Sequence, residues 1–313
     1  MKLISIGKAT FDERRLAARF LHGLGIEIGP LHVPIEVDKR CCRVKYIDRL
    51  TPVEVKNRFP ELKDENIVSP DIIFDVALDG LSPIADNSLD FVIASHLHEH
   101  VPNPLGLIKE CYRVLRNNGV LYLAAPDKNY TFDRDRHRTP LAHLISDLEK
   151  NTTTVDEAHL ADWVTNVNKK KVPDDPLEKD RLFKRELDRS IHVHVWTWED
   201  VAEFLRYMII HHRITLELCE AYLPKGVKDE AIFVLRKVNQ PPDDVILHFD
   251  SCLETLITRE KAMETVINLF KGDGSAGQNL SEIREELKDI HLRVRELHRF
   301  YTFPVRWFRK ILK

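Results

Sequence analysis

Acidic residues stand where two neighbouring strands of a parallel sheet are expected to end. Glu27 lies at the end of a short apolar run, and Gly29 lets the backbone turn tightly against a ligand. Asp48 ends the next strand-like run. Ligands of open parallel sheets bind outside the carboxyl ends of the strands, where a carboxylate can accept hydrogen bonds from a ribose diol. Leu31 stands where a second glycine of G-x-G-x-x-G would be, which argues against a dinucleotide site.

Strand-like and helix-like segments alternate around these residues. Continuous or alternating apolar runs predict strands at 25–28, 44–47, 72–78, 89–95, 120–125, 214–221 and 231–238. Apolar residues at helical spacing predict helices at 11–21, 53–59, 104–115 and 198–210. This order predicts an α/β fold with a mainly parallel, seven-stranded sheet, helices on both faces and a closing antiparallel pair.

The remaining segments predict additions to the sheet domain. Residues 1–127 and 191–240 form the sheet domain, and the polar, helical segment 128–190 is an insertion, either a solvated one or a lid over a substrate. Residues 241–313 form a helical region. Its heptads at 280–301 predict a coiled coil that joins a second copy or a partner helix, unless this helix packs on its own domain. The aromatic and basic residues of 300–313 suit an anionic membrane surface or an acidic partner.

Composition limits the possible functions. The 313 residues are 43% hydrophobic with a net charge of −3, and no apolar run is long enough to span a membrane. Five scattered cysteines indicate a reducing, cytoplasmic setting. Any contact of the protein with a membrane is then peripheral and at its inner face. Residues 279–313 carry nine basic and five acidic residues, whereas the whole chain has a net charge of −3. Residues 1–278 are therefore acidic overall, which argues against nucleic acid as a partner.

Several motifs, taken in order, resemble a known family. Glu27-Ile28-Gly29, Asp48 and Asp79-Gly80 are followed by DNSLDFVIASHLHEHVPNP (86–104), RVLRNNGVLYLAAPD (113–127) and HVHVWTWEDVAEFL (192–205). Together they resemble class I S-adenosylmethionine-dependent methyltransferases, in particular the type 11-like group. The resemblance implies a Rossmann-like fold with S-adenosylmethionine as cofactor, and makes 1–127 the cofactor-binding half.

The resemblance also implies which residues bind the cofactor. They are Glu27, Gly29, Pro30 and Leu31 in the first loop, Asp48 at the ribose, Asp79, Gly80 and Leu81 at the adenine, and Ser95 and His96 near the methyl group. Asp75 competes with Asp79 as the acidic residue on the adenine side.

A general base is expected where the acceptor is a hydroxyl. The candidates near the predicted strand ends are His96, His100, Asp127 and His137. The loop 127–137 suits a hydroxyl-rich or anionic acceptor, unless its charges pair with one another. The alternating histidines at 96, 98 and 100, and again at 192 and 194, have a spacing that zinc could use. Because the strand should already be ending there, we predict no metal site.

The sequence thus predicts a methyltransferase that O-methylates a sugar, a glycan or a small hydroxylated metabolite. A methyltransferase-like scaffold without turnover is the alternative, and a nucleotide-sugar or NAD enzyme on the same fold is a third hypothesis.

Overall fold

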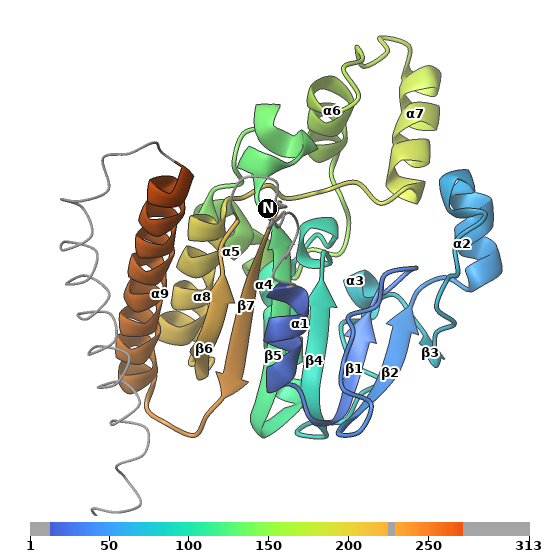
Figure 1. Ribbon diagram of the computed structural model, residues 1–313. Helices are drawn as coiled ribbons and strands as arrows, with labels where there is room; N and C mark the ends of the chain where they lie inside the picture. Colours follow the sequence, from blue (N-terminus) through green and yellow to red (C-terminus); the bar gives the residue numbers. More distant parts are fainter. Residues whose placement is uncertain (1–12, 225–228, 272–313) are drawn as a thin grey trace, which may run out of the picture. The chain divides into compact units, whose positions relative to one another are not determined.

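A seven-stranded sheet in the order β3-β2-β1-β4-β5-β7-β6 forms the centre of the computed structural model (Figure 1), which describes residues 13–224 and 229–271. The strands are β1 (Gly23–Ile28), β2 (Cys42–Asp48), β3 (Ile72–Ile73), β4 (Leu89–Ser95), β5 (Leu115–Pro126), β6 (Leu216–Tyr222) and β7 (Glu230–Lys237). Strands β1 to β5 pair in parallel, and β7 runs antiparallel to both β5 and β6. The insertion of β7 distinguishes this sheet from the 3-2-1-4-5-6 order of dinucleotide-binding domains. The predicted fold class is confirmed.

The central strands β4 and β5 have the apolar composition that a parallel sheet covered on both faces requires. Phe91–Ala94 of β4 and Leu121–Ala124 of β5 are fully buried. Strands that are covered on both faces need such continuous apolar runs, whereas a strand with one wet face would alternate. The order of the strands reverses between β1 and β4, so their carboxyl ends flank the point where ligands bind to open α/β sheets.

Helices cover both faces of the sheet. In Figure 1, α1 (Glu13–Ala17) crosses one face, and α4 (Pro104–Val114), α5 (Leu141–Lys150) and α8 (Trp198–His212) lie on the other. The helix α2 (Pro52–Arg58) lies beyond β2 and begins with a capping box in which Thr51 and Glu54 satisfy each other's backbone N–H groups.

Two predicted boundaries were wrong. The predicted strand at 72–78 ends at Ile73, because the Asp75 side chain accepts a hydrogen bond from the N–H of Ala77 and caps the short helix α3 (Val76–Asp79). The strand predicted at 120–125 begins at Leu115 instead, and within it Asn118 adopts a left-handed conformation and the pairing with β4 shifts its register. Both errors come from side-chain or register effects that hydrophobic periodicity does not record.

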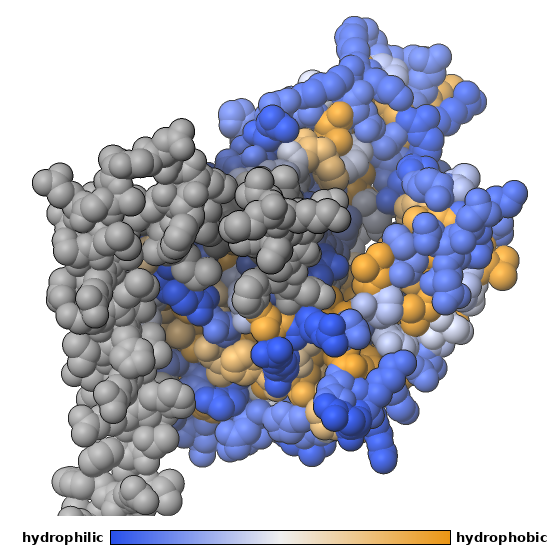
Figure 2. Space-filling view, in the orientation of Figure 1, coloured by the Kyte–Doolittle hydropathy of each residue, from blue (hydrophilic) through white to orange (hydrophobic). Residues whose placement is uncertain are grey.

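The segment between β5 and α8 contains three helices, α5, α6 (Glu157–Asn166) and α7 (Pro176–Asp188). A small hydrophobic core of its own joins α6 and α7 to the chain that returns to the sheet, and consists of Leu160, Val164, Phe183, Ile191 and Val193. Figure 2 shows that the outer surface around α6 and α7 is mainly hydrophilic. The returning chain, residues 189–197, is therefore fixed by packing although it has no regular secondary structure.

The chain divides into two compact units, Met1–Ile246 and Leu247–Lys313. The helix α9 (Pro242–Lys271) contains the residues at which this division falls. The predicted heptads at 280–301 and the aromatic, basic tail at 300–313 lie outside the described residues. Within the residues that are described, no helix combines the length and the hydrophobicity needed to cross a membrane.

Candidate functional site

The loop after β1 leaves open space beside its backbone. Gly29 has φ +66° and donates its N–H to the carbonyl of Ile47 at 2.8 Å, which holds the loop against β2. A Cβ built on Gly29 would have no heavy atom of the described residues within 4 Å. The loop therefore combines a conformation that favours glycine with room for a ligand close to the main chain.

Glu27 is a buried carboxyl group with one unused oxygen. Its side chain is 1% exposed, and its Oε1 accepts a hydrogen bond from the N–H of Ile35 at 2.9 Å. Its Oε2 has no hydrogen-bond partner in the described part of the chain. Burial raises the pKa of Glu27 to about 7, against the opposing effects of the Ile35 hydrogen bond and the charge of Arg14. A buried acceptor of this kind needs a donor, which a bound ligand with an ammonium or hydroxyl group can supply.

Asp48 stands at the carboxyl end of β2, next to the β1 loop. Its Oδ1 accepts a hydrogen bond from the N–H of Leu50 at 3.1 Å. Burial raises the pKa of Asp48, the backbone N–H groups of Leu50 and Arg49 oppose this rise, and the negative charge of Asp75 adds to it. Asp75, which lies between β3 and α3, is thus close enough to Asp48 for its charge to act on that carboxylate.

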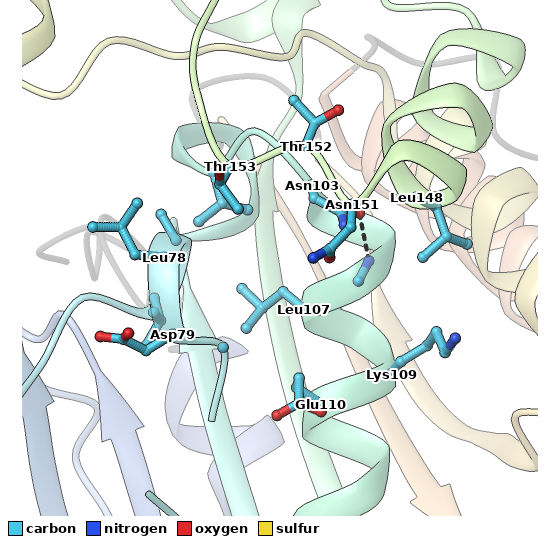
Figure 3. Close-up of a pocket in the computed structure, with 15 residues that line it drawn as sticks. Leu78, Asp79, Asn103, Leu107, Lys109, Glu110, Leu148, Asn151, Thr152 and Thr153 are labelled. Atoms are coloured by element: carbon cyan, nitrogen blue, oxygen red, sulfur yellow. Dashed lines mark hydrogen bonds between the residues drawn. The ribbon is translucent and has the colours of Figure 1, made fainter. Parts of the chain in front are cut away.

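Asp79 occupies a different place. It is exposed at the end of α3 and lines a cavity of about 310 Å³ together with Asn103, Glu110 and Asn151 (Figure 3). Leu81 is fully buried and donates its N–H to Glu110 at 3.0 Å, so it is held by α4. Of the two acidic residues that compete for the adenine side, Asp75 is the one whose negative charge raises the pKa of Asp48.

Leu31 has a left-handed backbone, with φ +46°, at the position where the sequence lacks a glycine. Its side chain packs against the hydrophobic cluster of Leu50, Val55 and Ile67. Pro30, immediately before it, is buried. The loop thus keeps a conformation typical of glycine, while the leucine side chain contributes to the packing beside α2.

The end of β4 carries a charged network centred on His96. Its Nε2 lies 2.8 Å from Oε2 of Glu230, and its Nδ1 lies 3.4 Å from Oε1 of Glu99. Glu230 also receives two hydrogen bonds of 2.7 Å from Arg14. Burial disfavours the imidazolium, but the hydrogen bond to Glu230 and the contact with the negative charge of Glu99 outweigh it and raise the pKa of His96 to about 10. His96 is therefore protonated at neutral pH and cannot accept a proton there.

His100, in the short 3₁₀ turn after β4, has a defined tautomer. Its Nδ1 lies 3.0 Å from the carbonyl oxygen of Ile191. Because a carbonyl only accepts hydrogen bonds, Nδ1 carries the proton and Nε2 presents a lone pair. Burial lowers the pKa of His100, although the charge of Glu99 acts in the opposite direction. His100 is thus a neutral imidazole beside the end of β4.

His192 forms a carboxylate–imidazole pair with Asp133. The two residues are buried, and Nδ1 of His192 lies 2.6 Å from Oδ2 of Asp133. Arg136 donates a 2.8 Å hydrogen bond to the other carboxylate oxygen. Despite the cost of burial, the hydrogen bond from His192 and the pairing with Arg136 lower the pKa of Asp133, so it is ionised. The ring centroids of His192 and His100 are 4.8 Å apart, which places this pair next to the end of β4.

Residues 37–123 match a protein family described as "Methyltransferase domain". This part of the chain is a class I S-adenosylmethionine-dependent methyltransferase domain. Its cofactor is S-adenosylmethionine. Three features beside the β1 loop fit this molecule: the unused oxygen of Glu27 can accept a hydrogen bond from its ammonium group, the open space at Gly29 lets it lie close to the main chain, and the carboxylate of Asp48 can accept hydrogen bonds from its ribose diol. A search among curated proteins gives no match.

Solved methyltransferase structures are similar to this chain at low sequence identity. A methyltransferase from Methanosarcina mazei is 16% identical, with 72% of this chain and 98% of that chain covered and a TM-score of 0.39. One from Bacillus halodurans, titled a putative methyltransferase, is 14% identical, with 70% and 94% covered and a TM-score of 0.38. The CurJ carbon methyltransferase is 11% identical, with 69% of this chain but only 48% of that chain covered and a TM-score of 0.37.

Two of the expected bases of this methyltransferase domain have other surroundings. Both carboxylate oxygens of Asp127 accept backbone hydrogen bonds, from Asn129 at 2.8 Å and from Trp198 at 2.9 Å, so Asp127 fixes the start of α8. His137 is exposed and lines a second cavity, of about 210 Å³. Asp127 thus holds the backbone in place, and His137 is an exposed side chain, unlike the buried imidazole of His192.

The alternating histidines do not share a face. The strand ends at Ser95, and His96 turns with φ +49° toward Glu230, whereas His100 faces Ile191. His98 is buried, and burial lowers its pKa to about 4. The pair of His192 and Asp133 was missed from the sequence, because the two residues are 59 positions apart and only folding brings them together.

Proposed function

We propose that this domain methylates a hydroxyl group of a sugar, a glycan or a small hydroxylated metabolite, with His192 as general base. The observation that carries this proposal is the 2.6 Å contact between His192 and the ionised, buried Asp133. Nδ1 donates to the carboxylate, so Nε2 is left to accept a proton, which is the arrangement that orients a catalytic imidazole.

The chemistry explains why a base is useful. Bound S-adenosylmethionine supplies an activated methyl group, and alignment of donor and acceptor provides much of the acceleration. A neutral hydroxyl is a weak nucleophile, and a positioned base that removes its proton contributes about 10²–10⁴-fold. His192 takes the proton on Nε2, Asp133 stabilises the resulting imidazolium, and Arg136 keeps Asp133 in place.

Aromatic side chains beside the base favour a ring-shaped acceptor. Phe132 is 55% exposed, and its ring centroid lies 4.8 Å from that of His192 and 5.7 Å from that of Trp163. Such rings supply a flat apolar surface, and Asp133 and Arg136 lie beside them. A sugar, which has apolar faces and hydroxyl edges, matches these surroundings.

On the cofactor side, we assign the amino-acid part of S-adenosylmethionine to Glu27 and Gly29, with Pro30 and Leu31 completing the loop. We assign the ribose to Asp48, the adenine side to Asp75, and the region of the methyl group to Ser95. His96, with its fixed positive charge, borders that region without acting as the base, and neutral His100 borders it as well. Asp79, Gly80 and Leu81 remain at the edge of the adenine side.

The test uses the full chain and methyl-labelled S-adenosylmethionine with a panel of sugars, glycans and small hydroxylated metabolites, read by mass spectrometry. The product should carry one added methyl group on oxygen. His192→Gln should lose most of the rate and keep cofactor binding, while His211→Gln, a change at the exposed end of α8, should match the wild type. Methylation of nitrogen or carbon, or an unchanged rate for His192→Gln, would contradict the proposal.

A further inference from the structure

Three imidazoles from separate segments converge near the sheet. His143 lies on α5, His159 on α6, and His194 on the chain that returns to α8. Their ring centroids are 5.1 to 5.6 Å apart, and each ring offers a nitrogen within 4.8 Å of the others. The rings are steeply inclined to one another, at 64° to 81°, so they are not stacked for packing.

His194 presents a lone pair that nothing around it uses. It is almost completely buried, and its Nε2 lies 3.2 Å from the carbonyl oxygen of Pro102. A carbonyl accepts only, so Nε2 carries the proton and Nδ1 is unprotonated. Nδ1 is buried and has no hydrogen-bond partner among the residues described. A buried polar atom left without a partner destabilises the fold, and a bound cation would give this lone pair a partner.

The other members of the cluster are arranged in the way metal ligands usually are. Nδ1 of His159 is hydrogen-bonded to Asp156 at 2.7 Å, so that Nε2 remains for a ligand. A carboxylate behind a ligating histidine fixes the ring and raises its basicity. Oδ2 of Asp147 lies 3.2 Å from Nε2 of His143 and 3.9 Å from Nε2 of His194, and it too is buried without a hydrogen bond from any described residue.

We propose that His143, His159 and His194 bind a divalent transition metal ion, zinc being the ion that best fits three imidazoles, with Asp147 as the nearest group for the fourth position. Zinc binds imidazole nitrogen at about 2.0–2.1 Å, so nitrogens around a tetrahedral ion are about 3.4 Å apart. His143 and His159 are only partly buried and can turn to close the remaining distance. The 210 Å³ cavity is lined by both residues and gives the ion a route in.

This site differs from the histidine sites considered in the sequence. The alternation at 96, 98 and 100 led to a prediction of no metal, and the ligands proposed here come from three elements that no local spacing connects. The ion would tie α5 and α6 to the returning chain two residues from His192. Metal binding by these three histidines requires neither the proposed acceptor nor the proposed base.

The experiment measures metal binding by the purified full chain after treatment with a chelator. Co²⁺ is titrated and followed by its visible absorption, which is strong for a tetrahedral site, and Zn²⁺ is then added as a competitor. His159→Gln removes one ligand, and Asp156→Asn keeps all three imidazoles but loses the supporting carboxylate. His137→Gln, in the same cavity, and His100→Gln, in the cluster with Glu99 and His192, are the controls.

We expect one ion per chain in the wild type and both controls, and loss of the tetrahedral spectrum in His159→Gln. Asp156→Asn should weaken binding by about 10- to 100-fold. Melting followed by circular dichroism shows whether each metal-free variant is folded. The proposal is overturned if the wild type binds no better than a folded His159→Gln, or if His100→Gln loses the ion while His159→Gln keeps it.

Discussion

The proposed cofactor edge of the sheet, at Glu27, Gly29 and Asp48, and the proposed acceptor side, around His192, are built in different ways. At the cofactor edge, Gly29 and Asp48 act through backbone conformation and single side chains at strand ends. On the acceptor side, each candidate group depends on a partner far along the chain, such as Asp133 with His192 or Arg136 with Asp162. The first kind of site is local in sequence, and the second exists only after the insertion has folded.

The difference implies that the two sides can be damaged separately. The strand ends are fixed by the parallel sheet, whose central strands are fully buried. The acceptor side is fixed by the small core of α6 and α7 and by ion pairs in the insertion. A substitution on one side should therefore leave the other side's binding or chemistry intact.

The largest effect is expected for the base. His192→Gln should lower kcat by about 10²–10⁴-fold, because the acceptor hydroxyl would have to lose its proton without help. The Kd for S-adenosylmethionine, measured by calorimetry, should stay unchanged, because His192 is paired with Asp133 of the acceptor side and not with Glu27, Gly29 or Asp48. Asp133→Asn should lower kcat in the same direction by removing the charge that orients the ring. A variant that loses cofactor affinity and kcat together would show that the two sides are coupled.

The converse substitution is at Asp48, the residue that we assign to the ribose. Asp48→Ala should weaken binding of S-adenosylmethionine by about 10- to 100-fold, since hydrogen bonds to a charged group contribute about 1.5–3 kcal/mol. Asp79→Ala, at the exposed end of α3, is the matched control and should change the affinity much less. Calorimetry of both variants compares these two carboxylates, and a larger loss for Asp79→Ala would show that the cofactor depends on Asp79 rather than on Asp48.

The sequence predicted the ends of β1 and β2 better than it predicted the contacts of the returning chain, for a physical reason. Strand ends follow from apolar runs, so Glu27, Gly29 and Asp48 could be placed from the sequence alone. The cap formed by Asp75 depends on one hydrogen bond, and this shortened the predicted third strand. His192 and His194 could not be placed, because the returning chain has no secondary structure and its partners come from α5, α6 and the loop after β5.

A smaller effect is expected from Glu27, whose pKa burial raises to about 7. Ionised Glu27 attracts the ammonium group of the cofactor, so affinity should rise by up to about tenfold from pH 6 to pH 8. The same ionisation lowers stability, which is full below the ordinary pKa of a glutamate and falls as the pH rises through about 7. Glu27→Gln should bind weakly at every pH, and a pH dependence that persists in this variant would assign it to another group.

The network at the end of β4 should affect stability rather than cofactor binding. The pKa of His96 is raised to about 10, so its contribution is complete below the ordinary pKa of histidine and is lost as the pH rises through about 10. Its partners Glu99 and Glu230 have pKa values lowered to about 2, because hydrogen bonds and charge outweigh their burial, and they lose their contribution only in strong acid. The Tm difference between wild type and His96→Gln should therefore be largest near pH 6 and shrink toward pH 10. A constant difference would mean that His96 acts through packing alone.

The smallest effect is expected at Leu31, where backbone and side chain oppose each other. A left-handed backbone costs a residue other than glycine about 1–2 kcal/mol, whereas the half-buried leucine gains a similar amount from the cluster with Leu50 and Val55. Leu31→Gly removes both contributions and adds the entropy of a flexible unfolded chain, so its stability should change by about 1 kcal/mol or less. Leu31→Ala keeps the backbone cost and loses the packing, so it should be the less stable of the two variants in urea unfolding. If the alanine variant were instead more stable than the glycine variant, residue 31 would not hold the left-handed conformation that the structure shows.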